Sequence, residues 1–95
     1  MVNLEYYNIK IGRSEHSKDI VIRGEIVNKS DKNYSSISLR IVLFVKNISI
    51  ASVVVLVNGI SSGASKVFEK NVEDLEYDAI AKDITRYEVY VESAY

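Results

Sequence analysis

A two-residue alternation of apolar and polar side chains constrains this chain more than any other feature. It is clearest in residues 36–45, where every second position is apolar, namely Ile37, Leu39, Ile41, Leu43 and Val45. Successive side chains of a strand point to opposite faces, so this period places those residues on one face of a β-strand. The chain also lacks proline and is rich in valine, isoleucine and tyrosine, which favour strands. Both features predict an all-β protein.

Six segments have the composition and period of strands: 4–11, 19–28, 36–45, 50–57, 64–70 and 85–93. Clusters of Asn, Ser, Asp, Lys and Gly separate them and are typical of turns. Short strands that recur roughly every 8–12 residues indicate a sandwich or a barrel. We therefore expect a two-layer antiparallel immunoglobulin-like β-sandwich of six to seven strands, as a single domain over residues 1–95.

Residues 72–82 break the alternation. Val72, Leu75 and Ala79 would share one face of a helix, and Asn71 could cap it. We expect a short helical turn there, and an irregular connection between the two sheets is the alternative. An oligonucleotide-binding barrel is the alternative fold. Its helix would follow the third strand, whereas the candidate helix follows the fifth.

Two details of the first two strands are also expected from the pattern. The alternation places Tyr7, Ile9 and Ile11 on one face of the first strand. In the second strand, Gly24 interrupts an apolar face. A glycine inside a strand indicates a bulge or a close approach of another group to the backbone.

The order of several short motifs resembles the FxLYD-type domain, a small sandwich. The matching features are Gly24-Glu25-Ile26-Val27-Asn28, Tyr34, the long alternating strand, Ile60-Ser61-Ser62-Gly63 and Phe68. The motif that names the family is altered here. Ile41 takes the place of Phe, Leu43 matches, Phe44 replaces Tyr and Val45 replaces Asp.

This resemblance implies a binding domain of an extracytoplasmic protein, and it supplies no catalytic residues. The first residues show no basic region followed by an apolar core, so we expect no signal peptide in this chain. No apolar run approaches the roughly 20 residues of a membrane-spanning helix. We therefore favour an extracytoplasmic domain of a larger or exported protein.

Residue types that carry chemistry are scarce. The chain has no cysteine and one histidine, His16, in a polar segment. Zinc sites and catalytic triads need more than one such group. None of the four glycines forms a phosphate-binding motif, and the acidic residues of 69–83 lack calcium-loop spacing. We predict no enzyme activity, no cofactor, and no catalytic or metal-binding residue.

The formal charge of −1, from 12 basic and 13 acidic residues, disfavours nucleic acid as a partner. A small nucleic-acid-binding barrel remains the alternative function, because basic residues gather in the first two-thirds of the chain. These residues are Lys10, Arg13, Lys18, Arg23, Lys29, Lys32 and Arg40.

Three Asn-x-Ser sequences begin at Asn28, Asn33 and Asn47, all in expected turns. Such sequences are acceptors for N-glycosylation in exported proteins, so these three asparagines are candidate glycosylation sites. Turns are themselves rich in Asn and Ser, which is the simpler explanation.

The hairpin formed by residues 37–57 is apolar on more than one face. Val42 and Phe44 point away from Ile41 and Leu43, and residues 53–57 are all apolar. A sandwich strand buries one face, so apolar side chains must remain outside. Exposed apolar patches mark interfaces. We expect a protein partner or a second copy to bind the outer face of this hairpin, around Val42, Phe44, Val53 and Val55. The alternative is that residues 71–83 or a chain terminus cover it.

Overall fold

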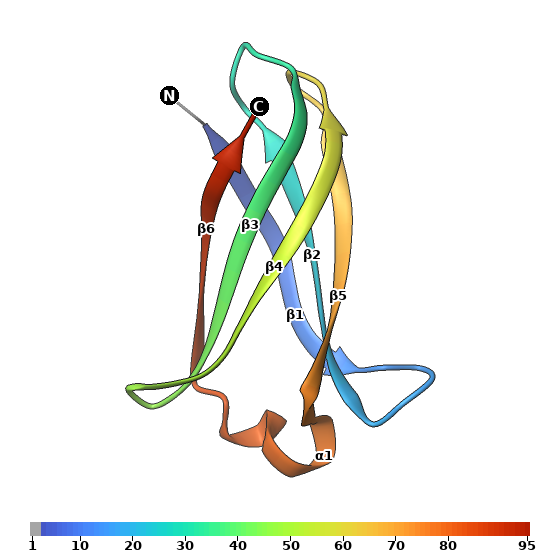
Figure 1. Ribbon diagram of the computed structural model, residues 1–95, viewed down its shortest axis with the longest axis vertical. Coiled ribbons are helices and arrows are strands. Elements are labelled where there is room, and N and C mark those ends of the chain that lie inside the picture. Colours follow the sequence, from blue (N-terminus) through green and yellow to red (C-terminus); the bar gives the residue numbers. More distant parts are fainter. Residues whose placement is uncertain (1–2) are drawn as a thin grey trace.

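A computed structural model describes residues 3–95 as six strands with one short helical segment (Figure 1). The strands are β1 (Leu4–Arg13), β2 (Asp19–Asn28), β3 (Tyr34–Val45), β4 (Ile48–Ile60), β5 (Ser65–Glu76) and β6 (Arg86–Ala94). An α-helical turn, α1 (Tyr77–Ile80), and a 3₁₀ turn, η1 (Ala81–Asp83), connect β5 to β6. All six strands expected from the alternation are present.

The strands form two antiparallel sheets of three strands each. One sheet has the order β1-β2-β5 and the other β4-β3-β6, and the two sheets stack as layers (Figure 1). The expected two-layer antiparallel sandwich is therefore confirmed. Within residues 3–95, no hydrogen-bonded ladder joins the two sheets at an edge. The alternative barrel is thus not formed.

The core lies between the two inner faces. The central strands β2 and β3 contribute fully buried rows, in which Ile20, Ile22 and Ile26 face the odd-numbered apolar residues of β3. The edge strands β4 and β5 add further buried residues, and β1 and β6 contribute partly buried side chains. As the period of two predicted, alternate residues of each strand face the core.

A β-bulge in β1 changes which tyrosine faces the core. The β1–β2 register shifts by one residue between Tyr7 and Lys10, and Asn8 has a φ of 54°. Asparagine tolerates this left-handed conformation better than most residues. Tyr6 and Ile9 consequently pack on the core, while Tyr7 is exposed. The expectation that Tyr7 shares a face with Ile9 was wrong, because the extra residue reverses the alternation.

Gly24 is a point of close approach, as its position in an apolar row indicated. It pairs directly with Phe68 of β5 and is buried. A Cβ atom on Gly24 would lie 2.5 Å from Ile9 Cδ1 and 2.6 Å from Phe68 Cζ. The missing side chain therefore makes room for two apolar groups of the neighbouring strands.

The helical turn begins later than expected. Residues 71–76 continue β5, because Asn71 and Val72 pair with Val21 and Ile20 of β2. Helical geometry starts at Tyr77, so the prediction of a turn near 72–82 was correct in kind and wrong in its first residues. Tyr77, Ile80 and Ile84 pack on one end of the core, which explains why this segment closes the end of the sandwich.

No helix in the described part of the chain is long and apolar enough to cross a membrane.

Candidate protein-binding face

The β3–β4 register decides which apolar residues lie on the outside of the hairpin. Val42 pairs with Ser52, Arg40 with Val54 and Ser38 with Leu56. Directly paired residues share a face, so Val54 and Leu56 lie on the same outer face as Val42. We call the apolar stripe of Val42, Phe44, Val54 and Leu56 the hairpin face.

Two of the four residues expected on this face lie elsewhere. Val53 pairs with Ile41 and Val55 with Leu39, which places both in the inner row. Val55 is only 5% exposed, and Val53 is partly buried against the core. The prediction of Val53 and Val55 as interface residues was therefore wrong. The run of five apolar residues has no alternation, so it could not show which of its members point outward.

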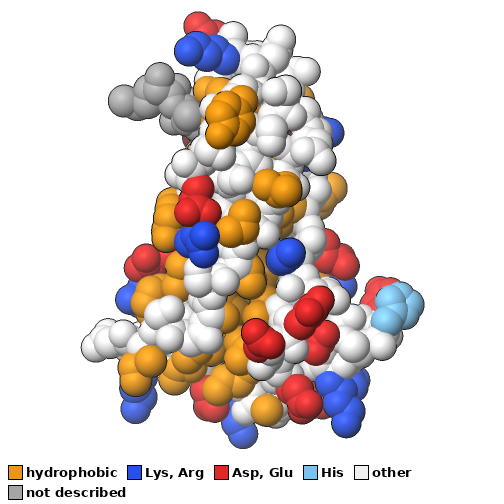
Figure 2. Space-filling view, in the orientation of Figure 1, with side chains coloured by type: hydrophobic (Ala, Val, Ile, Leu, Met, Phe, Trp, Pro, Cys, Tyr) orange, Lys and Arg blue, Asp and Glu red, His pale blue; other side chains and the backbone are white. Residues whose placement is uncertain are grey.

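The hairpin face is accessible within the described structure. Leu56 is 64% exposed, and Val42, Phe44 and Val54 are partly buried by their neighbours. Tyr90 of β6 pairs with Arg40 on the same side and is 46% exposed. Figure 2 shows hydrophobic side chains along this side of the molecule, interrupted by a few charged groups. The helical segment lies at the end of the sandwich (Figure 1), so it does not cover this face.

Arg40 spans the outer side of the β4-β3-β6 sheet. Its Nη1 donates to Ser52 Oγ on β4 at 2.7 Å, and its Nη2 lies 3.0 Å from Glu92 Oε1 on β6. The hydrogen bond to Glu92 raises the pKa of the Arg40 guanidinium above its ordinary value. This ion pair therefore lies beside Val54, along the length of the apolar stripe.

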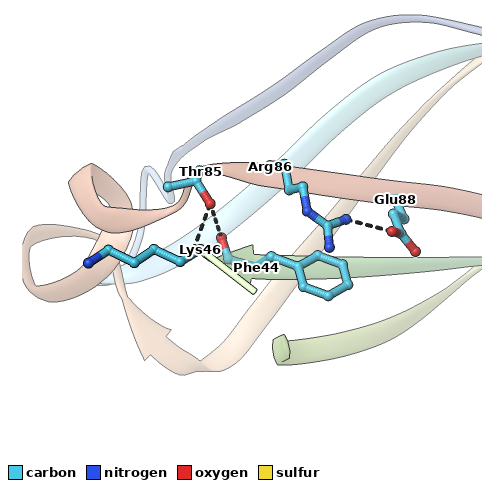
Figure 3. Close-up of polar contacts among 5 residues, drawn as sticks. All are labelled: Phe44, Lys46, Thr85, Arg86 and Glu88. Carbon is cyan, nitrogen blue, oxygen red and sulfur yellow. Dashed lines mark hydrogen bonds and ion pairs between the residues drawn. The ribbon is translucent and has the colours of Figure 1, made fainter. Parts of the chain in front are cut away.

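Arg86 borders the Phe44 end of the stripe. Its guanidinium lies 3.7 Å from the centroid of the Phe44 ring and pairs with Glu88 at 2.5 Å (Figure 3). Thr85 holds this end together, because its Oγ1 accepts from Lys46 N at 2.8 Å and its N–H donates to Phe44 O at 2.9 Å. The stripe is therefore an apolar surface flanked by two ion pairs, the usual composition of a binding surface with a polar rim.

The three asparagines of the Asn-x-Ser sequences have different environments. Asn47 lies exposed in the two-residue turn of the β3–β4 hairpin. Asn33 is exposed, and its Oδ1 accepts from Ser62 N at 2.9 Å. Asn28 is fully buried. The prediction of Asn28 as a glycosylation site was wrong for the folded chain, because an acceptor amide must be accessible.

Asn28 instead organises the loop between β2 and β3. Its Nδ2 donates to Lys32 O at 2.7 Å and to Ile60 O at 3.2 Å. Its Oδ1 accepts from Ser30 N at 3.0 Å and from Ser30 Oγ at 2.6 Å. This amide therefore closes the loop locally and ties it to the end of β4. An Asn followed two residues later by Ser is a turn signal that could have indicated this role.

An open hollow of about 520 Å³ lies on the opposite side, against the β1–β2 loop. It is lined by Arg13, Ser14, Glu15, His16, Ser17, Asp19, Arg23, Glu69 and Asn71. Its charges are mixed, and Arg23 Nε already pairs with Glu69 Oε2 at 2.8 Å. His16 is exposed at its border. Among residues 3–95, no group of His, Cys, Asp and Glu is placed to hold a metal ion.

Comparison with known proteins does not add a relative to this description. No protein-family model matches the chain, and no curated protein matches it.

Proposed function

We propose that this chain is a non-catalytic protein-binding module that docks its partner on the hairpin face. The observation that carries the proposal is the exposure of Leu56 on an outer sheet face that also presents Val42, Phe44 and Val54. An apolar stripe of this kind gains free energy when a partner removes it from water. The ion pairs at Arg40 and Arg86 would orient that partner.

The strand order supports an immunoglobulin-like assignment within this proposal. The sheet β1-β2-β5 has the order of strands A, B and E, and the sheet β4-β3-β6 has the order C′, C and F. Immunoglobulin-like domains commonly act as binding modules. Membership of the FxLYD-type family stays a prediction from the motifs.

No specific observation favours the alternative of nucleic-acid binding. Two of the basic residues that suggested it, Arg23 and Arg40, are paired with the carboxylates of Glu69 and Glu92. Their charges are therefore paired within the fold and do not contribute to an extended basic surface.

Replacing Leu56 with lysine should weaken partner binding about tenfold, because Leu56 is the most exposed member of the hairpin face and loss of a hot-spot residue costs more than about 1 kcal/mol. Its exposure predicts that the free energy of unfolding changes by less than about 0.5 kcal/mol. The test compares proteins that co-purify with tagged wild-type chain and with Leu56→Lys, followed by affinity measurement with the purified partner.

Val67→Lys is the matched control. Val67 is 82% exposed on the outer face of the other sheet, so it offers the same change on the opposite side. The proposal expects Val67→Lys to bind like the wild type. A partner whose affinity falls in Val67→Lys and is unchanged in Leu56→Lys would refute the hairpin face as the binding surface.

A further inference from the structure

The outer edge of β6 is unpaired in the described structure. β6 is an edge strand of its sheet, and within residues 3–95 no strand lies on its outer side (Figure 1). Its inward-facing residues Tyr87, Val89 and Val91 pair with residues of β3 that are at most 1% exposed. Tyr87 is nevertheless 43% exposed, and Val89 and Val91 are only partly buried. The inner row of β6 is therefore open on the side where a further strand would pack.

The other three edges carry features that hinder pairing. β1 is interrupted by the bulge at Asn8, and β5 has charged residues at half of its positions. At β4, Lys66 Nζ donates to the backbone carbonyl of Asn58 at 3.0 Å. Bulges, charges and covered carbonyls protect sheet edges from association. β6 keeps a regular ladder from Arg86 to Val91, and the partly exposed inner row of Tyr87, Val89 and Val91 lies along it.

We propose that β6 pairs antiparallel with β6 of a second copy of this chain, about a two-fold axis through Val89. In this register Val89 lies opposite itself, Tyr87 lies opposite Val91, and Arg86 lies opposite Glu92. The symmetry repeats the Tyr87–Val91 and Arg86–Glu92 contacts, so with the single Val89–Val89 contact the pair gains three apolar contacts and two pairs of opposite charge. An isologous strand pairing of this kind is β-augmentation between identical partners.

The charges of β6 select this register over its neighbours. The two cores lie on the same side of the joint sheet only if inward-facing residues pair with inward-facing residues. The inward-facing residues of β6 have odd numbers, so the numbers of two paired residues must sum to an even number. An axis through Glu88 places that carboxylate opposite its own copy. An axis through Tyr90 places Glu88 opposite Glu92. Like charges directly opposite destabilise a strand pair, so the axis through Val89 is favoured.

The side chains of Arg86 and Glu92 both lie on the outer face of the sheet, where those of two paired copies could meet. Arg86 stacks on Phe44, and Glu92 is the extra residue of a ladder irregularity that places its carboxylate beside Arg40. Both groups lie on the outer face of the sheet. In the dimer each Glu92 would receive the partner's Arg86 in addition to Arg40. The result is a continuous six-stranded sheet that presents two hairpin faces on the same side.

A charge exchange tests the register. Light scattering after size exclusion should find a wild-type dimer whose population rises with concentration. Arg86→Glu and Glu92→Arg should each weaken the dimer roughly tenfold, because two opposite-charge pairs become like-charge pairs. An equimolar mixture of the two variants should restore association, since each chain then carries the charge that the other needs. Circular dichroism verifies that both variants are folded.

A cross-link provides a second readout that does not depend on charge. The chain has no cysteine, so a single introduced thiol has only its copy as a partner. Directly opposite residues of antiparallel strands have Cα atoms about 4.5–5.5 Å apart, within disulfide range. Val89→Cys should form a covalent dimer under mild oxidation. Val67→Cys, on the outer face of the other sheet, should stay monomeric.

The proposal is overturned if the wild type is monomeric at every concentration and Val89→Cys cross-links no faster than Val67→Cys. It is also overturned if the mixed charge variants fail to associate while the wild type is a dimer. This inference concerns a different surface from the hairpin face, and the two can fail separately. A dimer lost in Leu56→Lys and kept in both charge variants would place the second copy on the hairpin face instead.

Discussion

Replacing Asn28 with alanine is expected to lower the free energy of unfolding by about 2–4 kcal/mol, the largest effect that we predict for a single side chain. The amide makes four hydrogen bonds, and the carbonyl of Ile60 is one of its buried partners. Truncation removes these bonds and leaves buried groups unpaired, which costs more than loss of an exposed bond. Urea denaturation followed by circular dichroism measures the change.

Asn47→Ala is the control for this prediction, because Asn47 belongs to the same sequence pattern but is exposed in the hairpin turn. We expect it to change the free energy of unfolding by less than about 0.5 kcal/mol. Asn28→Asp should be at least as destabilising as Asn28→Ala, because it replaces two donated hydrogen bonds with a buried charge. Equal stability of Asn28→Ala and Asn47→Ala would show that the buried amide has no structural role.

The second large effect is expected at Gly24, where an alanine should cost about 1–3 kcal/mol through overpacking. The added Cβ would come within 2.6 Å of both Ile9 Cδ1 and Phe68 Cζ, well inside contact distance. The half-buried end of Ile9 can move, whereas the Phe68 ring is held between the sheets. Thermal or urea unfolding of Gly24→Ala gives the measurement.

Gly12→Ala and a double variant separate steric cost from the general effect of replacing a glycine. A Cβ on Gly12 meets only Nη1 at the end of the long Arg23 side chain, at 3.3 Å, so this change should cost less than about 0.5 kcal/mol. Phe68→Leu should relieve part of the clash, so Gly24→Ala with Phe68→Leu should cost at least about 0.5 kcal/mol less than the sum of the single changes. Strict additivity would contradict a contact between these two positions.

The strands were predictable because their alternation is a local property. Every second residue from Ile37 to Leu43 is apolar, and these four residues are buried as the period of two requires. The role of Gly24 could also be predicted, since a glycine within an apolar row of a strand indicates a bulge or a close approach of another group. Structural features that depend only on the local pattern of one segment could therefore be predicted from the sequence.

The remaining features depend on pairing with distant segments. Residues 53–57 are apolar at every position, so only their register with β3 separates Val54 and Leu56 from Val53 and Val55. The bulge at Asn8 reverses the alternation of β1 by a conformation that no local rule required. Asn28 could serve as a surface acceptor or as a buried turn residue, and the carbonyl of Ile60, 32 positions away, decides between them.

The end of β5 is a further case of a distant segment overriding a local tendency. Val72 and Leu75 have helical spacing, yet Asn71 and Val72 extend the ladder with β2. Backbone hydrogen bonds to β2 and burial of Val72 outweigh the weak preference of a few residues for a helix. The helical turn is left with residues 77–83, where the ladder has ended.

Site-specific photo-crosslinking tests the central claim, that the hairpin face is the binding surface, most directly. A photo-reactive amino acid replaces Leu56 in one variant and Val67 in another, and both are irradiated in the cells that produce the protein. We predict a discrete covalent adduct with a protein at position 56 and none at position 67. Adducts at position 67 without any at position 56, or none at either, would contradict this account of the hairpin face.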